Sequence, residues 1–147
     1  MSETTKAQEA YEAVRAYFSR PGAELARSGE RGPDSECKYR DEEGRKCAVG
    51  CLISDELYDK LNDESGLFLD DFGRVEGVQH ELEKRFEKGE NGNLKELAGI
   101  IGYDDRPRFL FLASAQSAHD MEADDASHLV VLLDRIAKNQ GLRVVTQ

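Results

Sequence analysis

The chain has 147 residues, of which 39% are hydrophobic and 34% charged, and its 30 acidic against 20 basic residues give a net charge of −10. This length and balance predict a single compact domain over residues 1–147 that is large enough for a genuine core. The longest apolar runs cover only a few residues, so we expect no membrane span. No run of lysine or arginine could neutralise several phosphates, which disfavours direct binding to nucleic acid.

The N-terminal part predicts one clear helix over residues 5–18. Its apolar residues recur at spacings of three and four, which places them on one helix face: Ala7, Tyr11, Val14 and Phe18. Pro21 then interrupts the pattern, because a proline disfavours a helical residue before it. Residues 23–28 are expected to form one more helical turn, and residues 29–36, with two glycines and a proline, predict a loop.

All three cysteines fall in the next segment, residues 37–53, where we expect a small two-stranded hairpin. Residues 37–40 predict a short strand, and 41–44 a turn that ends on a glycine, where a positive φ costs little. Residues 45–53 then run back, as a second strand or turning into a helix. The side chains expected to anchor the hairpin are Cys47, Val49, Cys51 and Ile53, with Tyr39 and Tyr58 near its edges.

Helical patterns account for most of the remaining chain. Ser54 is a helix N-cap signal followed by acids, and Pro107 suits the first turn of a later helix. The expected helices follow Ser54 through Leu61, and then cover residues 75–86, 94–101 (capped by Asn93), about 105–116 and 124–139, with irregular chain at 62–73 and a loop at 88–93. The fold class predicted from these elements is α+β, mostly α, with five to six helices and the hairpin.

The cysteines raise two chemical possibilities. Cys37, Cys47 and Cys51 could bind zinc together with one histidine, but their C-x9-C and C-x3-C spacing lacks the tight pair usual in such sites. Alternatively, Cys47 could act as a nucleophile, with His119 as its base and Asp120 orienting that base. Because free cysteines often pack as small apolar residues, the sequence favours neither metal nor cofactor. Motifs for nucleotide binding, serine hydrolysis and zinc proteolysis are absent.

Acidic residues gather in one stretch whose only base is Lys60. They are Asp55, Glu56, Asp59, Asp63, Glu64, Asp70 and Asp71. Such a face could dock on a basic partner by mimicking a phosphate backbone, or it could be a solvated surface that aids solubility. The sequence leaves both interpretations open.

One signature carries a family resemblance. It consists of Cys37-x-Tyr39-Arg40, Gly44 and residues 47–58, which read C-A-V-G-C-L-I-x-D-E-x-Y with Ser54 at the first x. It resembles a group of small, largely uncharacterised proteins of bacteriophages and prophages. The group is similar further on, with a His-Asp pair and a final amphipathic helix ending in Gly-Leu. Its pattern has proline where this chain has Ser54, and alanine in some members at the position of Cys51. The resemblance implies a phage-related setting and no particular reaction.

Two functions from different classes follow. The first is a non-enzymatic, phage-encoded protein that binds a host or defence protein, for example to inhibit it, through the acidic stretch. The second is a small zinc-binding or cysteine-dependent enzyme that uses Cys47 with His119 and Asp120. Residues 1–6 lack the charged and apolar regions of a secretory signal, so we expect the protein to act in the cytoplasm of the bacterial host, where its cysteines stay reduced. The sequence does not indicate an oligomeric state.

Overall fold

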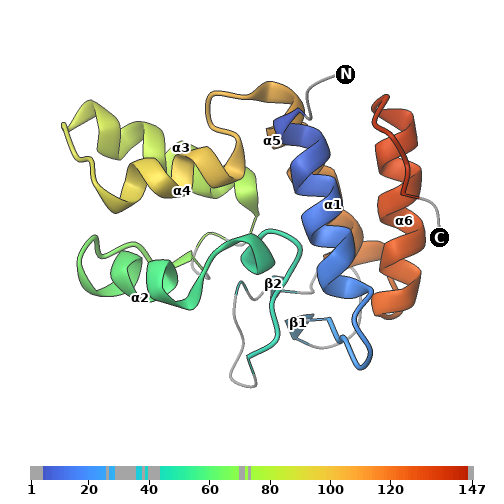
Figure 1. Cartoon of the computed structure of the whole chain (residues 1–147). Helices are drawn as coiled ribbons and strands as arrows, with labels where there is room; N and C mark the ends of the chain where they lie inside the picture. The colour runs from blue at the N-terminus through green and yellow to red at the C-terminus, as the bar shows by residue number, and fades with distance from the viewer. Residues whose placement is uncertain are drawn as a thin grey trace.

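The computed structural model describes residues 5–25, 27–28, 36–37, 39, 44–69, 72 and 74–145, with backbone alone at 27–28 and 36–37. Helices dominate this part of the chain (Figure 1). The α-helices are α1 (Lys6–Phe18), α2 (Asp55–Asp63), α3 (Val75–Glu87), α4 (Asn93–Ile101), α5 (Arg106–Ser117) and α6 (Ala126–Asn139). A 3-10 turn, η1 (Gly50–Leu52), precedes α2, and a π-helical turn, η3 (Ala118–Glu122), continues α5. None of these helices has the length and apolar character needed to cross a membrane.

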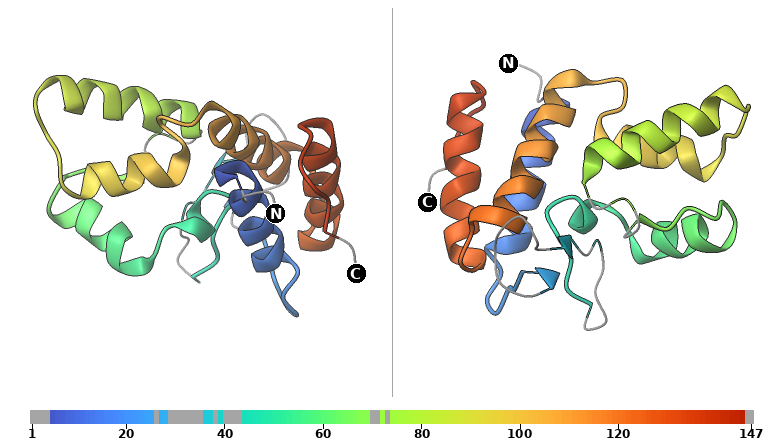
Figure 2. Two further views of the ribbon diagram at one scale, coloured as in Figure 1. Left: turned by 45° about the horizontal axis from the view of Figure 1, so that its top comes forward. Right: turned by 180° about the vertical axis from the view of Figure 1, so that it is seen from behind.

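The helices form two groups that share one core. Helices α1, α5 and α6 pack against one another, while α3 and α4 lie side by side with α2 next to α4 (Figures 1 and 2). Helix α5 also contacts α3 and α4, so it joins the two groups. Buried apolar side chains from all six helices belong to a single hydrophobic cluster.

Side-chain caps explain where several helices begin. Ser54 Oγ accepts a hydrogen bond from the Leu57 amide at 3.1 Å, and Asp105 accepts one from the Arg108 amide at 3.0 Å. These bonds satisfy N–H groups that lack a partner within the helix.

The six main helices predicted from periodicity are confirmed, with small differences at their ends. The predicted cap at Asn93 is wrong, because α4 begins at Asn93 itself and Gly92 precedes it.

The predicted hairpin over residues 37–53 is wrong, and so is the α+β class. The described part has a single two-residue antiparallel ladder, in which β1 (Arg27–Ser28) pairs with β2 (Glu36–Cys37). This ladder overlaps the predicted hairpin only at Cys37, and its strand β1 lies where a helical turn was expected at 23–28. Residues 44–53 form turns and η1 instead of a strand. The predicted loop at 29–35 and turn at 41–43 lie outside the described residues.

Burial and glycine packing explain why residues 45–53 do not form a strand. Cys47, Ala48 and Val49 are consecutive and all fully buried, whereas a strand with one face on the core would alternate. The Cys51 amide bonds to the Cys47 carbonyl at 3.0 Å, which closes a local helical turn. A Cβ on Gly50 would lie 2.0 Å from the backbone oxygen of Tyr39, so these two backbones touch at a place where a side chain has no room.

The expected anchoring side chains nevertheless pack as predicted. Cys47, Val49 and Ile53 are buried in the shared core, and Cys51 is partly buried against it. Tyr39 is buried as well. Residues 47–53 of the signature therefore form a packing unit against the shared core, just before α2 begins.

Candidate functional site

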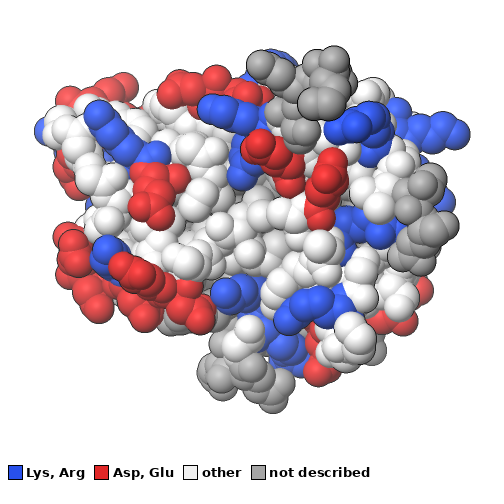
Figure 3. All heavy atoms as spheres, viewed as in Figure 1, with Lys and Arg blue, Asp and Glu red and all other residues white. Residues whose placement is uncertain are grey.

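The predicted acidic stretch lies largely on α2 and the residue after it. Its described members are all solvent-exposed: Asp55, Glu56, Asp59, Asp63 and Glu64. We call these five residues the α2 acidic face. In Figure 3, acidic atoms gather at the lower left of the molecule, over α2. Asp70 and Asp71, which the sequence also placed in this stretch, lie outside the described residues.

Two lysines contact the α2 acidic face. Lys60 Nζ lies 3.0 Å from Glu56 Oε1, and Lys46 Nζ lies 3.3 Å from Asp55 Oδ1. The hydrogen bond that Lys60 donates to Glu56 raises the pKa of Lys60, with smaller contributions from the charges of Glu64 and Glu96. Glu96, on α4, therefore extends the negative potential beyond α2. Exposed ion pairs of this kind add little to stability, so a binding partner could replace them at low cost.

The segment after α2 carries an exposed aromatic ring. Phe68 is 50% exposed, although its neighbours Leu67 and Leu69 are buried. Arg85 on α3 holds the start of this segment, because its guanidinium donates to the backbone oxygens of Ser65 and Gly66. The sequence pattern did not predict this anchored loop, which exposes an aromatic side chain a few residues after the α2 acidic face.

The two described cysteines sit in packed surroundings. Cys47 Sγ accepts hydrogen bonds from the Gly50 amide at 3.3 Å and from Gln116 Nε2 at 3.8 Å. Cys51 Sγ donates to the Ala48 carbonyl at 3.2 Å. Burial raises the pKa of the Cys51 thiol, and the nearby Cys47 adds to the effect. A thiol with a raised pKa is a poor nucleophile at neutral pH.

Gln116 is a central polar residue whose role the sequence did not predict. Its side chain is 1% exposed, and its Oε1 accepts the Val75 amide at 3.1 Å. It thereby binds the first residue of α3, a helix whose N-cap, Arg74, makes no side-chain capping bond. A glutamine on an otherwise apolar helix stripe was the available signal, because such a residue needs buried partners.

His119 and Asp120 form a buried pair in the π-helical turn. His119 Nδ1 lies 2.7 Å from Asp120 Oδ1, and the His119 side chain has no exposed surface. The ring also lies 5.8 Å, between centroids, from that of Phe18 on α1. The structure thus brings the predicted base and its orienting acid together, but at a place that substrate could reach only if the core opened.

Potential metal ligands do not gather in the described part of the chain. Within the ranges that the structure covers, no three His, Cys, Asp or Glu side chains gather in a way that could hold an ion. The side chain of Cys37, the third cysteine of the predicted zinc site, is outside those ranges. Cys47 and Cys51 lie on one turn, and the polar contact that Cys47 makes across the core is with the amide of Gln116.

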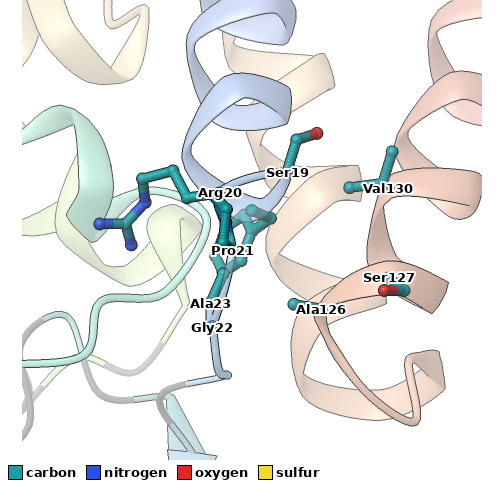
Figure 4. Close-up of a pocket in the computed structure, with 9 residues that line it drawn as sticks. Ser19, Arg20, Pro21, Gly22, Ala23, Ala126, Ser127 and Val130 are labelled. Atoms are coloured by element: carbon teal, nitrogen blue, oxygen red, sulfur yellow. The ribbon is translucent and has the colours of Figure 1, made fainter.

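A pocket of about 390 Å³ lies between the end of α1 and the start of α6 (Figure 4). Its polar lining includes the hydroxyls of Ser19 and Ser127, and Phe18 and Val130 are among its apolar residues. Arg20 also lines it, but its guanidinium carbon lies 3.9 Å above the centre of the Tyr17 ring. The pocket therefore lacks a pair of acid and base groups that could carry chemistry.

Comparisons with known protein families, with curated proteins and with solved structures found no match.

Proposed function

We propose that this protein is a non-enzymatic binding protein that engages a basic protein partner through the α2 acidic face. The observation that carries the proposal is the exposure of all five described carboxylates of that face, opposed by contacts with two lysines. The phage-like signature of residues 37–58 adds the biological setting: a partner from the bacterial host, in its cytoplasm.

Charge and geometry both support a protein partner. A surface with excess negative potential attracts cationic surfaces and speeds their encounter. The half-exposed ring of Phe68 supplies an apolar contact, and aromatic side chains are enriched among the residues that dominate binding energy. The candidate catalytic residues have the opposite character, since Cys47 and His119 are both fully buried.

The experiment is a capture of bacterial lysate proteins on three immobilised full-length baits. The first bait is the natural chain, and the second carries Asp59→Asn, Asp63→Asn and Glu64→Gln on or beside α2. The third is a matched control with the same loss of charge on exposed positions of α3: Glu76→Gln, Glu83→Gln and Glu87→Gln. We expect the natural bait and the control to retain the same basic protein, and the second bait to lose it.

Salt concentration separates specific electrostatic binding from other contacts. Raising the ionic strength from about 0.05 M to about 0.3 M shortens the range of these charges, so retention should weaken without vanishing. Absence of a retained protein at both salt levels contradicts the proposal. Equal loss on the α2 and α3 variants would show that net charge, not the α2 acidic face, is responsible.

A further inference from the structure

The C-terminal segment, residues 142–145, folds back over the molecule after α6 ends. Gly141, with φ of +76°, makes the reversal, because this backbone conformation is easy for glycine alone. The segment then runs back beside α6, as the end of the chain in Figure 1 shows. We call residues 142–145 the strap.

Two side chains of α1 hold the strap by its backbone. Gln8 Nε2 donates to the Arg143 carbonyl at 2.9 Å, and Gln8 Oε1 accepts the Arg143 amide, also at 2.9 Å. The Tyr11 hydroxyl accepts the Val145 amide at 2.9 Å. The side-chain amide of Gln8 thus pairs with both backbone groups of Arg143, as a residue on a neighbouring β-strand would.

The side chains of the strap divide between core and solvent. Leu142 and Val145 pack against the shared core, while Arg143 and Val144 are exposed. The strap is therefore held by both backbone groups of Arg143, by the Val145 amide and by the apolar side chains of Leu142 and Val145. The side chains of Arg143 and Val144 take no part in the hydrogen bonds that hold the strap.

The receiving surface is held in place by contacts that do not involve the strap. The Tyr11 hydroxyl donates to Asp134 Oδ1 at 2.6 Å, and Arg15 Nε donates to the same oxygen at 2.8 Å. Asp134 belongs to α6, so these bonds join the two helices beneath the strap. Gln8 Nε2 is further held by Glu12 Oε2 at 2.8 Å. These bonds do not depend on the strap, so they can hold Gln8 and Tyr11 in place when it leaves.

From this geometry we infer a peptide-binding site formed by Gln8, Tyr11 and the adjoining core, which the strap occupies within its own chain. The partner that fits it is an extended segment of another protein with apolar side chains three residues apart. Three hydrogen bonds with α1 side chains, one from the Leu142 amide to the Ala137 carbonyl at 2.8 Å and two partly buried side chains make a weak contact. Tethering gives the strap an effective concentration in the millimolar range. An incoming segment must therefore compete with the strap.

Fluorescence anisotropy with a labelled peptide tests the inference. The peptide has the sequence of residues 141–147, and the protein is the full chain carrying Leu142→Ser and Val145→Ser, which weaken its own strap. We expect this variant to bind the peptide at least about tenfold more tightly than the natural chain does, since the competitor is weakened. A peptide with serine at the two apolar positions should not bind.

Adding Gln8→Met to the strap-weakened variant supplies the control. Methionine keeps the length and helix preference of glutamine but removes both hydrogen bonds to the strap backbone, so binding should fall by about tenfold. Circular dichroism confirms that each variant is folded. Equal binding of the natural and serine-substituted peptides, or no binding by a folded strap-weakened variant, overturns the inference.

Amide hydrogen exchange gives a second test on the natural chain. If the strap opens by itself, the Arg143 and Val145 amides exchange faster than core amides such as that of Leu133, and slower than the amide of Val144. If the Arg143 and Val145 amides exchange only at the rate of global unfolding, the strap is a fixed part of the fold and the inference fails.

Discussion

The two helix groups use polar side chains in contrasting ways. In the group of α1, α5 and α6, several partly buried polar contacts join residues far apart in sequence, as in the bonds from Tyr11 and Arg15 to Asp134. In the group of α2, α3 and α4, many polar contacts are local and near the surface, such as Lys60 with Glu56 and Arg85 with Glu81.

This difference separates architecture from surface chemistry. Buried hydrogen bonds stabilise one arrangement, because an unpaired polar group in the core costs about 1–3 kcal/mol. Exposed pairs cost little to break and leave their charges available. The first group therefore maintains the fold and holds the strap, while the second presents the α2 acidic face. Substitutions in the two groups should therefore differ in their effect on the free energy of unfolding.

Gly50→Ala should cause the largest loss, because the new Cβ would overlap the backbone of Tyr39 where η1 packs beside α1. We expect the free energy of unfolding to fall by about 3 kcal/mol, as measured by urea denaturation. The control is Gly99→Ala on α4, where nothing lies within 4 Å of the added atom. This change should stabilise the protein by about 0.5–1 kcal/mol. Equal effects of the two substitutions would contradict the packing described for Gly50.

Gln116→Met tests the buried link between α5 and α3. It retains the shape of the side chain but leaves the Val75 amide without its acceptor, so stability should fall by about 2 kcal/mol. Gln140→Met, at an exposed position after α6, should change stability by less than about 0.5 kcal/mol. A small effect at Gln116 would mean that the two groups are joined by apolar packing alone.

Tyr11→Phe should cost about 1 kcal/mol at neutral pH, because it removes the hydroxyl that bonds Asp134 and the Val145 amide. Burial and the hydrogen bond to Asp134 raise the pKa of Tyr11 above its ordinary value of 10.0. The stabilisation is therefore complete below pH 10 and is lost as the pH rises above it. Denaturation of both proteins across this range should show their difference shrinking at high pH; a constant difference contradicts the assignment.

Glu81→Gln should have the smallest effect, about 0.5 kcal/mol, because its ion pair with Arg85 is partly exposed to solvent. Arg85 lowers the pKa of Glu81 below its ordinary value of 4.5. Its contribution is present above that pH and is lost as the pH falls, opposite to the behaviour of Tyr11. Stability curves of the two proteins should converge in acid, and divergence there would count against the pair.

Helical periodicity carried most of the fold prediction. Caps such as Ser54 and Asp105 bond to amides three residues away, so the sequence contains the whole signal for them. The predicted hairpin is wrong because its expected anchors, Cys47, Val49, Cys51 and Ile53, do not alternate with exposed residues. Ala48 is buried too, and whether a small residue lies inside cannot be determined from its type alone.

The candidate sites show the same division. The exposure of the α2 acidic face was predictable, since charged residues cluster along a short stretch beside a helix cap. The strap contacts were not, because Gln8 and Arg143 are 135 residues apart. Similarly, Gln116 bonds Val75 across 41 residues. Such pairings depend on how the helices pack, and no local spacing reports them.

The π-helical turn has a consequence for how this chain can change in length. The Ala123 amide bonds to the Ala118 carbonyl at 2.8 Å, five residues back, so this turn holds one residue more than an α-helical turn. Deleting one residue here would leave an α-helical turn, with each later residue rotated by about 100° about the helix axis as far as Ala123, where the backbone becomes extended. If Ala118 were the residue removed, His119 and Asp120 would turn away from the core, and residues 123–125 would have to rearrange to keep α6 packed against α1. The number of residues in this turn, more than their type, is therefore under constraint.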